Sequence, residues 1–170
     1  VKDYAYGGGY TAQNNDTEKE IKKEMEERRG AYVTWSQDSK KFSLSRSDDR
    51  HLNELWVIDV LKTPRPKLET YKYQMPGEKD TTEVELLVFD AETKESIKIK
   101  TNKFKNQWVN VSRKSSTNKE KLADYVASQW ISASSDKLYF TRSSRDLKKF
   151  EFCVADLNTG DVRVLLEESM

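Results

Sequence analysis

The residues of this chain that could take part in nucleophilic or acid–base chemistry are few and scattered. The 170-residue sequence holds a single histidine, His51, and a single cysteine, Cys153. Nucleophilic catalysis needs a serine or cysteine on a strained turn, a base, and a group that orients the base. The chain has no Gly-x-Ser-x-Gly motif, His51 stands in a charged loop, and Cys153 lies in the apolar run 152–155. We therefore predict no catalytic residues here, with His51 a solvated loop residue and Cys153 a small buried one.

The charge pattern does not predict a metal site or a nucleic-acid interface either. The acidic pairs Asp48–Asp49 and Asp16–Glu18 lack the spacing of a calcium-binding loop. The 30 basic and 29 acidic residues are interleaved and give a net charge of +1, so the one-sided basic surface that nucleic acids require is missing. We expect no metal, no cofactor and no nucleic-acid partner.

No apolar window approaches the length of a membrane span, and no signal peptide is present. The chain begins at Val1 instead of a methionine. We therefore expect it to be part of a longer protein, so the missing targeting signals say nothing about the location of that protein.

The elements that must position these residues begin with a loop and a helix. Residues 1–15 contain three consecutive glycines and are expected to form a loop. Residues 16–29 predict a short charged helix, because a capping residue and early acidic side chains precede late arginines and a stop at Gly30. Only Ile21 and Met25 are apolar in this helix, and so narrow a stripe can dock on a surface but cannot enter a core.

From residue 31 onward the pattern is that of β-strands. Apolar runs bounded by polar turns predict strands over 32–35, 41–46, 55–58, 68–73, 84–89 and 96–100. An aromatic content of 11% argues against disorder. The charged content of 35% fits strands that bury one face and hydrate the other.

A repeated block is the most informative feature of the chain. The segment from Trp35 to Arg46 is echoed by the segment from Trp130 to Arg142. A strand that ends in Asp follows each closing arginine, and the three strands with this ending finish at Asp59, Asp90 and Asp156. The repeat unit is thus an aromatic strand, a polar turn, an alternating strand, a strand ending in Asp, a turn and an outer strand.

Four-stranded units of this kind bury both faces by stacking around an axis, as in a β-propeller. At roughly 40–50 residues per blade, the chain would hold about three to four antiparallel blades. We therefore predict an all-β fold in which residues 1–170 are a fragment of one propeller domain, with a helical insertion at 16–29 and blade repeats at 31–100 and 126–168. A β-sandwich is the alternative, and the repeated block favours the propeller.

The four tryptophans allow two interpretations. Aromatic rings in apolar strands usually pack in a core, whereas exposed rings can stack on carbohydrate. Because most of them lie in apolar strand contexts, packing between blades is expected for Trp35, Trp56, Trp108 and Trp130.

These blocks resemble the propeller of dipeptidyl peptidase IV and related prolyl-oligopeptidase-type serine peptidases. Residues 35–40 are similar to the family's Trp-Ser-Pro-Asp-Gly/Ser-Lys strand and turn, with Gln37 in place of proline. Residues 64–78 resemble a stretch that ends in Tyr-Pro-x-x-Gly-x-x-Asn-Pro, although the Asn-Pro is absent here. Residues 138–142 and 156–160 are similar to a later blade with an Asp-x-x-Thr-Gly turn. The resemblance covers roughly residues 26–168.

The resemblance implies a non-catalytic part of the N-terminal propeller of a dipeptidyl-peptidase-IV-like serine exopeptidase, which gates access to the active site. The implied partners are the missing blades and an α/β-hydrolase domain of the same parent chain, the peptide substrate, and a second copy if the protein is a homodimer. It also implies a periplasmic or extracellular location. The alternative is a stand-alone propeller that binds a protein or a glycan without a hydrolase.

Glu26 and Glu27 resemble the family's adjacent glutamates in a Glu-Glu-x-x-small-Ala-Tyr run, which bind the α-ammonium of the substrate. Two carboxylates suit an ammonium group, which has three donors and one charge. The aromatic residues that precede the glutamates in the family are replaced by residues 22–25 here, and Arg28 and Arg29 could neutralise the pair. The resemblance makes Glu26 and Glu27 the candidate substrate-binding residues, and the alternative is an ordinary solvated helix face.

Overall fold

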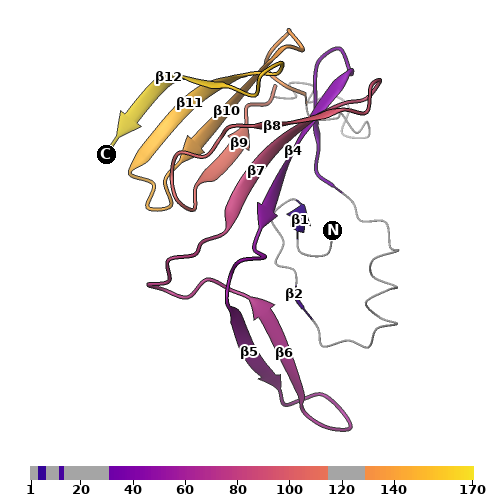
Figure 1. The fold of residues 1–170 in the computed structure, drawn as a ribbon, viewed down its shortest axis with the longest axis vertical. Helices are drawn as coiled ribbons and strands as arrows, with labels where there is room; N and C mark the ends of the chain where they lie inside the picture. Colours follow the sequence, from indigo (N-terminus) through magenta and orange to yellow (C-terminus); the bar gives the residue numbers. More distant parts are fainter. Residues whose placement is uncertain (1–3, 7–11, 14–30, 115–128) are drawn as a thin grey trace, which may run out of the picture.

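The structure is a computed structural model that describes residues 4–6, 12–13, 31–114 and 129–170 (Figure 1). Within these residues the fold is all-β and antiparallel, as predicted. The strands are β1 (Tyr4–Tyr6), β2 (Ala12–Gln13), β3 (Thr34–Trp35), β4 (Lys41–Asp48), β5 (Glu54–Asp59), β6 (Lys67–Lys72), β7 (Glu83–Asp90), β8 (Ser96–Ile99), β9 (Trp108–Val111), β10 (Lys137–Ser143), β11 (Lys149–Asp156) and β12 (Val162–Ser169). The helix predicted over 16–29 lies outside the described residues, and none of the described ones forms a helix that could cross a membrane.

The first sheet has five strands in the order β1-β4-β7-β8, with β3 also paired to β4. β3 pairs with the start of β4 and β1 with its end, so the two short strands share one edge. β4 and β7 pair over their whole length. The strand that completes the repeat unit after Arg46 is therefore β7, which ends at Asp90. The sequence-based assignment of this place to the strand ending at Asp59 is wrong, because that strand belongs to a hairpin inserted between β4 and β7.

The second sheet is a meander in the order β12-β11-β10-β9. Its edge strand β9 has no counterpart among the predicted segments. Trp130 makes an isolated bridge with Arg113, and its backbone N–H donates a hydrogen bond of 2.7 Å to the carbonyl of Trp35 in the first sheet. The two sheets are thus joined at the two tryptophans that open the repeated blocks.

The turns after β7 and β11 are alike. Asp90 and Asp156 begin them, and each carboxylate accepts the backbone N–H two residues later. Lys94 and Gly160 occupy the same place, with φ of 61° and 73°. A Cβ at Gly160 would lie 2.8 Å from the carbonyl oxygen of Lys98 in β8. The turn of the second sheet therefore lies directly against the outer strand of the first, and glycine permits both the φ and this approach.

The third sheet consists of the hairpin β5–β6 with β2 alongside β6. The hairpin projects away from the two larger sheets (Figure 1). Opposite one another on its strands, Ile58 and Leu68 are 61% and 43% exposed, and Trp56 is 68% exposed. The expectation that Trp56 packs between blades is wrong in this chain, because no described strand covers the hairpin.

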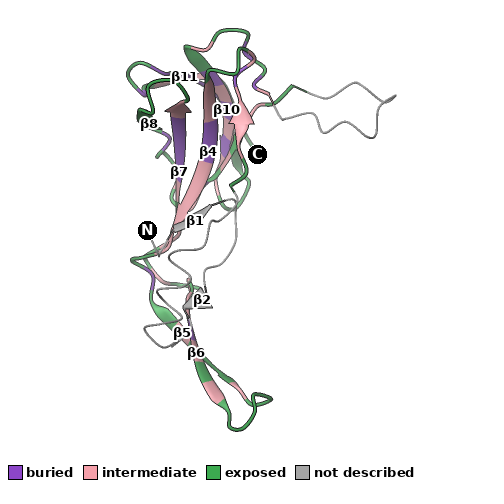
Figure 2. Cartoon of the chain, turned by 90° about the vertical axis from the view of Figure 1, so that its right-hand side faces the viewer, coloured by how far each residue is buried: buried purple, intermediate pink, exposed green. Residues whose placement is uncertain are grey.

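The hydrophobic core lies between the first and second sheets, where Figure 2 shows the buried segments of β4, β7 and β10. Its fully or nearly fully buried members are Leu86, Val88 and Ile99 from the first sheet and Trp130, Leu138, Phe140, Cys153, Ala155 and Leu157 from the second sheet and its flanks. The indole Nε1 of Trp130 donates to Ser43 Oγ over 2.9 Å, so core packing is confirmed for this tryptophan. Trp108 is 59% exposed, and the same expectation is wrong there because Trp108 begins an edge strand.

The two large sheets use equivalent faces differently. Side chains alternate across a strand, so Phe42, Leu44 and Arg46 in β4 correspond to three residues of β10: Leu138, Phe140 and Arg142. In the second sheet this face packs against the first sheet, with Leu138 and Phe140 in the core. In the first sheet it is turned away from that core, and it carries stacked rings of Phe42 and Phe89 at 5.2 Å.

Candidate functional site

His51 and Cys153 lie in unrelated environments. His51 is exposed in the loop after β4, and its Nε2 is 2.7 Å from the carbonyl oxygen of Thr81. Cys153 is completely buried in β11, with its Sγ 3.8 Å from a carboxylate oxygen of Glu151. Burial raises the pKa of the Cys153 thiol, which keeps it protonated and unreactive. The structure does not bring the two residues together as a nucleophile and its base.

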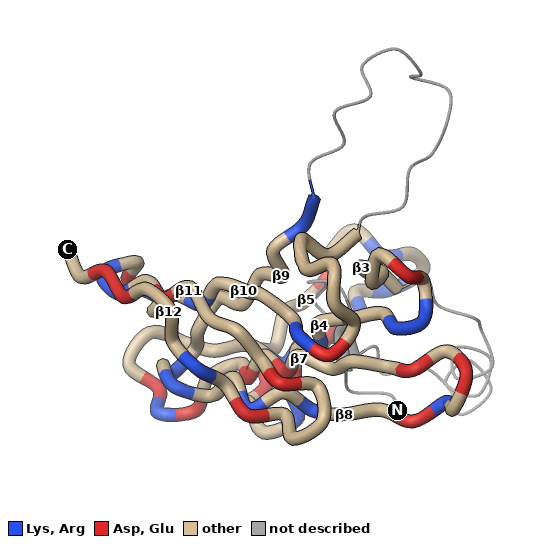
Figure 3. The backbone as a smooth tube through the Cα atoms, turned by 90° about the horizontal axis from the view of Figure 1, so that it is seen from above, with Lys and Arg blue, Asp and Glu red and all other residues tan. Residues whose placement is uncertain are grey.

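Of the carboxylates considered for metal binding, Asp16 and Glu18 lie outside the described residues, and Asp48 is bound by a neighbouring arginine. Asp48 accepts both a backbone and a side-chain hydrogen bond from Arg50, and the side-chain bond lowers the pKa of Asp48. Across the described ranges, no three His, Cys, Asp or Glu side chains gather as metal ligands would. Basic and acidic residues are interspersed along the chain (Figure 3).

Glu26 and Glu27 lie outside the described residues, so the structure carries no information on their contacts. The first described residues after them, Ala31 and Tyr32, line one end of a hollow of about 520 Å³. This hollow follows the seam between β4 of the first sheet and β9 of the second. Tyr32 is 84% exposed there.

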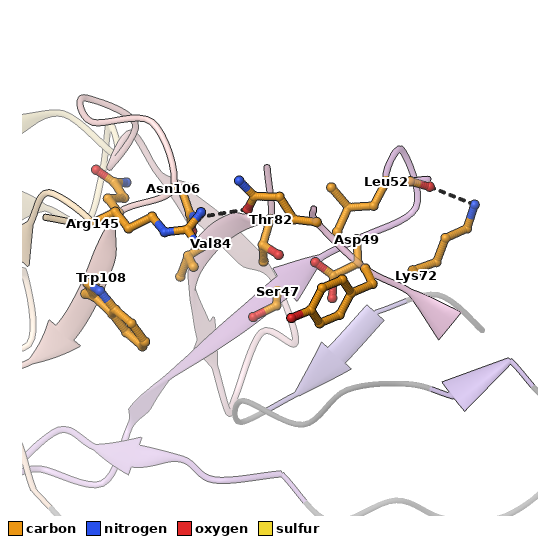
Figure 4. A pocket seen from close by; sticks show the side chains of 12 residues that line it. Ser47, Asp49, Leu52, Lys72, Thr82, Val84, Asn106, Trp108 and Arg145 are labelled. Atoms are coloured by element: carbon orange, nitrogen blue, oxygen red, sulfur yellow. Dashed lines mark hydrogen bonds between the residues drawn. The ribbon is translucent and has the colours of Figure 1, made fainter. Parts of the chain in front are cut away.

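A second pocket, of about 300 Å³, continues the same seam (Figure 4). The two hollows share Ser47, Val84 and Trp108, and together we call them the seam groove. The walls of the second pocket come from the end of β4 and the loop after it, the end of β6, the start of β7, the start of β9 and the β10–β11 turn. It therefore lies where the first sheet, the second sheet and the hairpin meet, a place that no segment of the sequence marks.

Most polar groups of this pocket are already hydrogen-bonded. Lys72 Nζ donates to the carbonyl of Leu52 over 2.9 Å, and the Asn106 amide donates to Gln74 Oε1 over 3.0 Å, as Figure 4 shows. Gln107 donates to the carbonyl of Thr101 and accepts two backbone N–H groups. These contacts hold the walls in place.

Two lining groups are available to a ligand. Arg145 makes no hydrogen bond or ion pair with any residue in the described part of the chain. Trp108 is 59% exposed. A guanidinium and an indole face beside one pocket can bind a ligand that carries both a negative charge and apolar surface.

Each large sheet carries one cluster of Arg, Glu and Lys across its strands, and the cluster of the second sheet lies on the face that packs against the first sheet. Arg142 Nε donates to Glu151 Oε2 over 2.6 Å, and Lys103 pairs with the other oxygen. Arg142 also reaches the segment that follows β8, where its Nη1 donates to the carbonyl of Thr101 over 2.8 Å. Burial raises the pKa of Glu151, but the hydrogen bonds and charges of Lys103 and Arg142 outweigh burial and keep the pKa below its ordinary value.

The first sheet has a similar cluster, in which the arginine and the glutamate occupy the equivalent positions of β4 and β7 and the lysine comes from β8. Arg46 Nε donates to Glu85 Oε2 over 2.8 Å, and Lys98 pairs with the other oxygen. Burial raises the pKa of Glu85, and the two cations more than compensate and lower it. Arg46 and Arg142, which close the repeated blocks, therefore each form a cross-strand ion pair with a glutamate. From the sequence alone, only the recurrence of the arginine was visible.

The chain was compared with known families and structures. The dipeptidyl peptidase IV N-terminal region family matches residues 22–170. A dipeptidyl peptidase 4 from Porphyromonas gingivalis aligns over 100% of this chain with 15% identity and a TM-score of 0.63, and the aligned part is 20% of that protein. A protein from Bacteroides ovatus assigned as a dipeptidyl aminopeptidase IV aligns over 81% of this chain with 18% identity and a TM-score of 0.61. No curated protein matches the chain.

The chain spans only about a fifth of the solved proteins that it resembles, 20% of the first and 17% of the second. At identities below one fifth, these likenesses establish a shared fold. The family match extends over most of the chain, from the segment that precedes Glu26 to Met170.

Proposed function

Because the chain belongs to the dipeptidyl peptidase IV N-terminal region family, we propose that it is a non-catalytic propeller portion of a dipeptidyl-peptidase-IV-like serine exopeptidase. The observation that carries the proposal is the family match over residues 22–170, which contains both repeated blocks and the Glu26–Glu27 pair. In this proposal the hydrolysis itself belongs to an α/β-hydrolase domain of the same parent protein.

The equivalent faces of the two sheets support a propeller. In the second sheet, the face with Leu138 and Phe140 is covered by the first sheet. The equivalent face of the first sheet carries the stacked rings of Phe42 and Phe89, and no described sheet packs against it. The far face of the second sheet carries another stacked pair, Tyr139 and Phe152 at 5.9 Å. Further blades on both sides would bury these rings, as successive blades do around a propeller axis.

We propose that the propeller gates access to the active site and that Glu26 and Glu27 capture the α-ammonium of the peptide. Glu27 precedes Ala31, the first residue of the seam groove, by four positions. A chain of four residues reaches at most roughly 14 Å. A peptide held at its amino end by the glutamates could therefore extend into the groove.

The test is kinetic and uses the full-length parent protein. Replacing both glutamates (Glu26→Gln with Glu27→Gln) should lower kcat/KM for peptides with a free amino terminus and leave hydrolysis of a small acyl ester unchanged. The matched control is Glu18→Gln with Glu20→Gln, which removes the same charge from the same segment. Equal losses on both substrates, or no loss on the peptide, would refute the capture role.

The hairpin supports a homodimer as a further part of the proposal. A two-stranded hairpin is marginally stable by itself, and the apolar side chains of Trp56, Ile58 and Leu68 are largely exposed. A second copy could cover them with its own hairpin, since dimers about a two-fold axis use the same patch twice. Sedimentation should show a monomer for Trp56→Ser with Ile58→Ser and a dimer for Val57→Ser. A monomeric parent protein would exclude this arrangement.

The family relationship also favours a periplasmic or extracellular location, which fractionation of the expressing cells would test. The alternative function is a stand-alone propeller that binds a protein or a glycan. A parent gene that encodes further blades but no Gly-x-Ser-x-Gly elbow would favour this alternative. A parent protein that cleaves dipeptides from a proline-containing reporter and is blocked by a serine-directed inhibitor would exclude it.

A further inference from the structure

We propose that the pocket at the junction of the first sheet, the second sheet and the hairpin is a binding site for a carboxylate-bearing peptide segment, with Arg145 as the ion partner. This site goes beyond the capture of an amino terminus, and it does not depend on Glu26 or Glu27. Its volume of about 300 Å³ lies at the lower end of the range for small-ligand pockets.

The charge of the pocket selects the carboxylate. The Arg145 guanidinium has no partner among the described residues, and a free guanidinium at a concave surface binds a carboxylate with two parallel hydrogen bonds. Arg145 also borders a hollow on its other side, rimmed by four lysines: Lys103, Lys105, Lys148 and Lys149. The single acid of that rim, Asp146, already accepts hydrogen bonds from Ser144 Oγ and the Lys148 backbone. Lys103 is paired with Glu151, but Arg145 and the other three lysines outnumber the two carboxylates, Asp49 and Asp146, so the local field favours an anion.

The remaining surface of the pocket suits a peptide better than a bare anion. Trp108 is 59% exposed and offers a flat face on which a proline ring or an aliphatic side chain can stack. The pocket is open to the rest of the seam groove through Ser47, Val84 and Trp108. An extended segment can thus lie along the seam with its carboxylate at Arg145.

Part of the site is rigid, as specific binding requires. Gln107, the neighbour of Trp108, is 4% exposed and uses its amide for bonds to the backbone at Thr101, Lys103 and Phe104. The amide of Asn106 is held by Gln74. The start of β9 is therefore fixed before a ligand arrives, which reduces the entropy lost on binding.

The experiment is calorimetric titration of the full-length protein with N-acetylated tripeptides. N-acetyl-Ala-Ala-Ala supplies a terminal carboxylate, N-acetyl-Ala-Glu-Ala amide supplies a side-chain carboxylate, and N-acetyl-Ala-Ala-Ala amide supplies none. At least one carboxylate peptide should bind about tenfold or more tightly than the neutral amide. The peptide that binds identifies whether a chain terminus or an acidic side chain is recognised. The acetyl group removes the ammonium, so failure here leaves the capture role of Glu26 and Glu27 untouched.

Variants separate the site from general surface charge. Arg145→Gln should weaken the carboxylate peptide about tenfold or more, Arg145→Lys should restore part of the loss, and Trp108→Ala should weaken binding further. The matched control is Arg163→Gln, an exposed arginine of β12 that does not line the pocket. Unchanged affinity in Arg145→Gln, equal affinity for the neutral amide or for acetate, or no binding of either carboxylate peptide would overturn the proposal.

Discussion

Replacing Glu151 should destabilise the protein more than any other single charge deletion in the two sheets. The Glu151 side chain is 0% exposed and the side chain of its partner Arg142 is 6% exposed. In Glu151→Gln, Lys103 can turn into water because its side chain is 41% exposed, but Arg142 stays between the sheets without a counter-charge. Two unit charges about 4 Å apart interact by about 4 kcal/mol at an effective dielectric constant of about 20. Breaking a buried pair from one side typically costs about 3–5 kcal/mol.

The equivalent cluster of the first sheet supplies the matched control. Glu85→Gln removes the same kind of interaction from Arg46, whose side chain is 19% exposed, and from Lys98, whose side chain is 51% exposed. Both cations can gain water there, so the free energy of unfolding should fall by less than in Glu151→Gln. Urea denaturation followed by tryptophan fluorescence measures both losses under the same conditions.

A double variant distinguishes a stranded charge from lost packing. Arg142→Met with Glu151→Leu replaces the pair by apolar side chains of similar volume, which is often neutral or stabilising. The double variant should therefore recover most of the stability that Glu151→Gln loses. If the double variant is as unstable as the single one, or if Glu151→Gln costs no more than Glu85→Gln, the explanation by an uncompensated buried arginine is refuted.

Three further predictions follow from the same geometry. The pKa values of Glu85 and Glu151 lie below the ordinary 4.5, so the two ionised carboxylates stabilise the protein fully well above that pH, and this stabilisation is lost as the pH falls through the lowered values. The difference in unfolding free energy between the unmodified protein and the double variant Glu85→Gln with Glu151→Gln should therefore shrink in acid. Urea midpoints at several pH values would measure it. Gly160→Ala should lower the free energy of unfolding by about 1–3 kcal/mol, because φ is 73° and the new Cβ would lie 2.8 Å from the carbonyl oxygen of Lys98. Gly77→Ala, with φ of 88° and open space around its Cβ, should lower it by less. Equal losses in thermal denaturation would contradict the close approach at Gly160. Ser43→Ala should lower the free energy of unfolding by about 1–3 kcal/mol, because it leaves the buried Trp130 Nε1 without an acceptor. Ser45→Ala, two residues further along β4 on the same face, should be close to neutral in the same measurement.

The predicted strands of the first sheet and hairpin agree with β3 to β8 because their sequences alternate between apolar and polar side chains. The repeated blocks were visible because strand, turn and strand have a fixed local chemistry, in which a serine or aspartate caps each turn. The sequence does not show that β4 pairs with β7, because an inserted hairpin has no local feature that marks it as an insertion. Whether a strand pairs with the next strand along the chain or with a later one is decided by contacts between distant residues.

The candidate sites divide in the same way. Glu26 and Glu27 were identified from adjacent letters that resemble a family motif, and they stay a prediction because they lie outside the described residues. The pocket of Arg145, Trp108 and Asp49 could not be predicted from the sequence, since its residues come from five separate loops and strand ends. The exposure of Trp56 and Trp108 was likewise not predictable, because a tryptophan in an apolar run has the same local pattern whether or not a second sheet covers it.

The scarcity of catalytic groups was determined by the sequence alone, because an inventory with one histidine, one cysteine and no nucleophile motif needs no coordinates. The all-β class was determined as well, since side-chain alternation is a property of neighbouring residues. Only the tertiary structure decided that the arginines closing the repeated blocks pair with Glu85 and Glu151, and that one of these pairs is sealed between the sheets. The physical reason is that burial and ion pairing depend on which distant strands come together, which no single stretch of sequence contains.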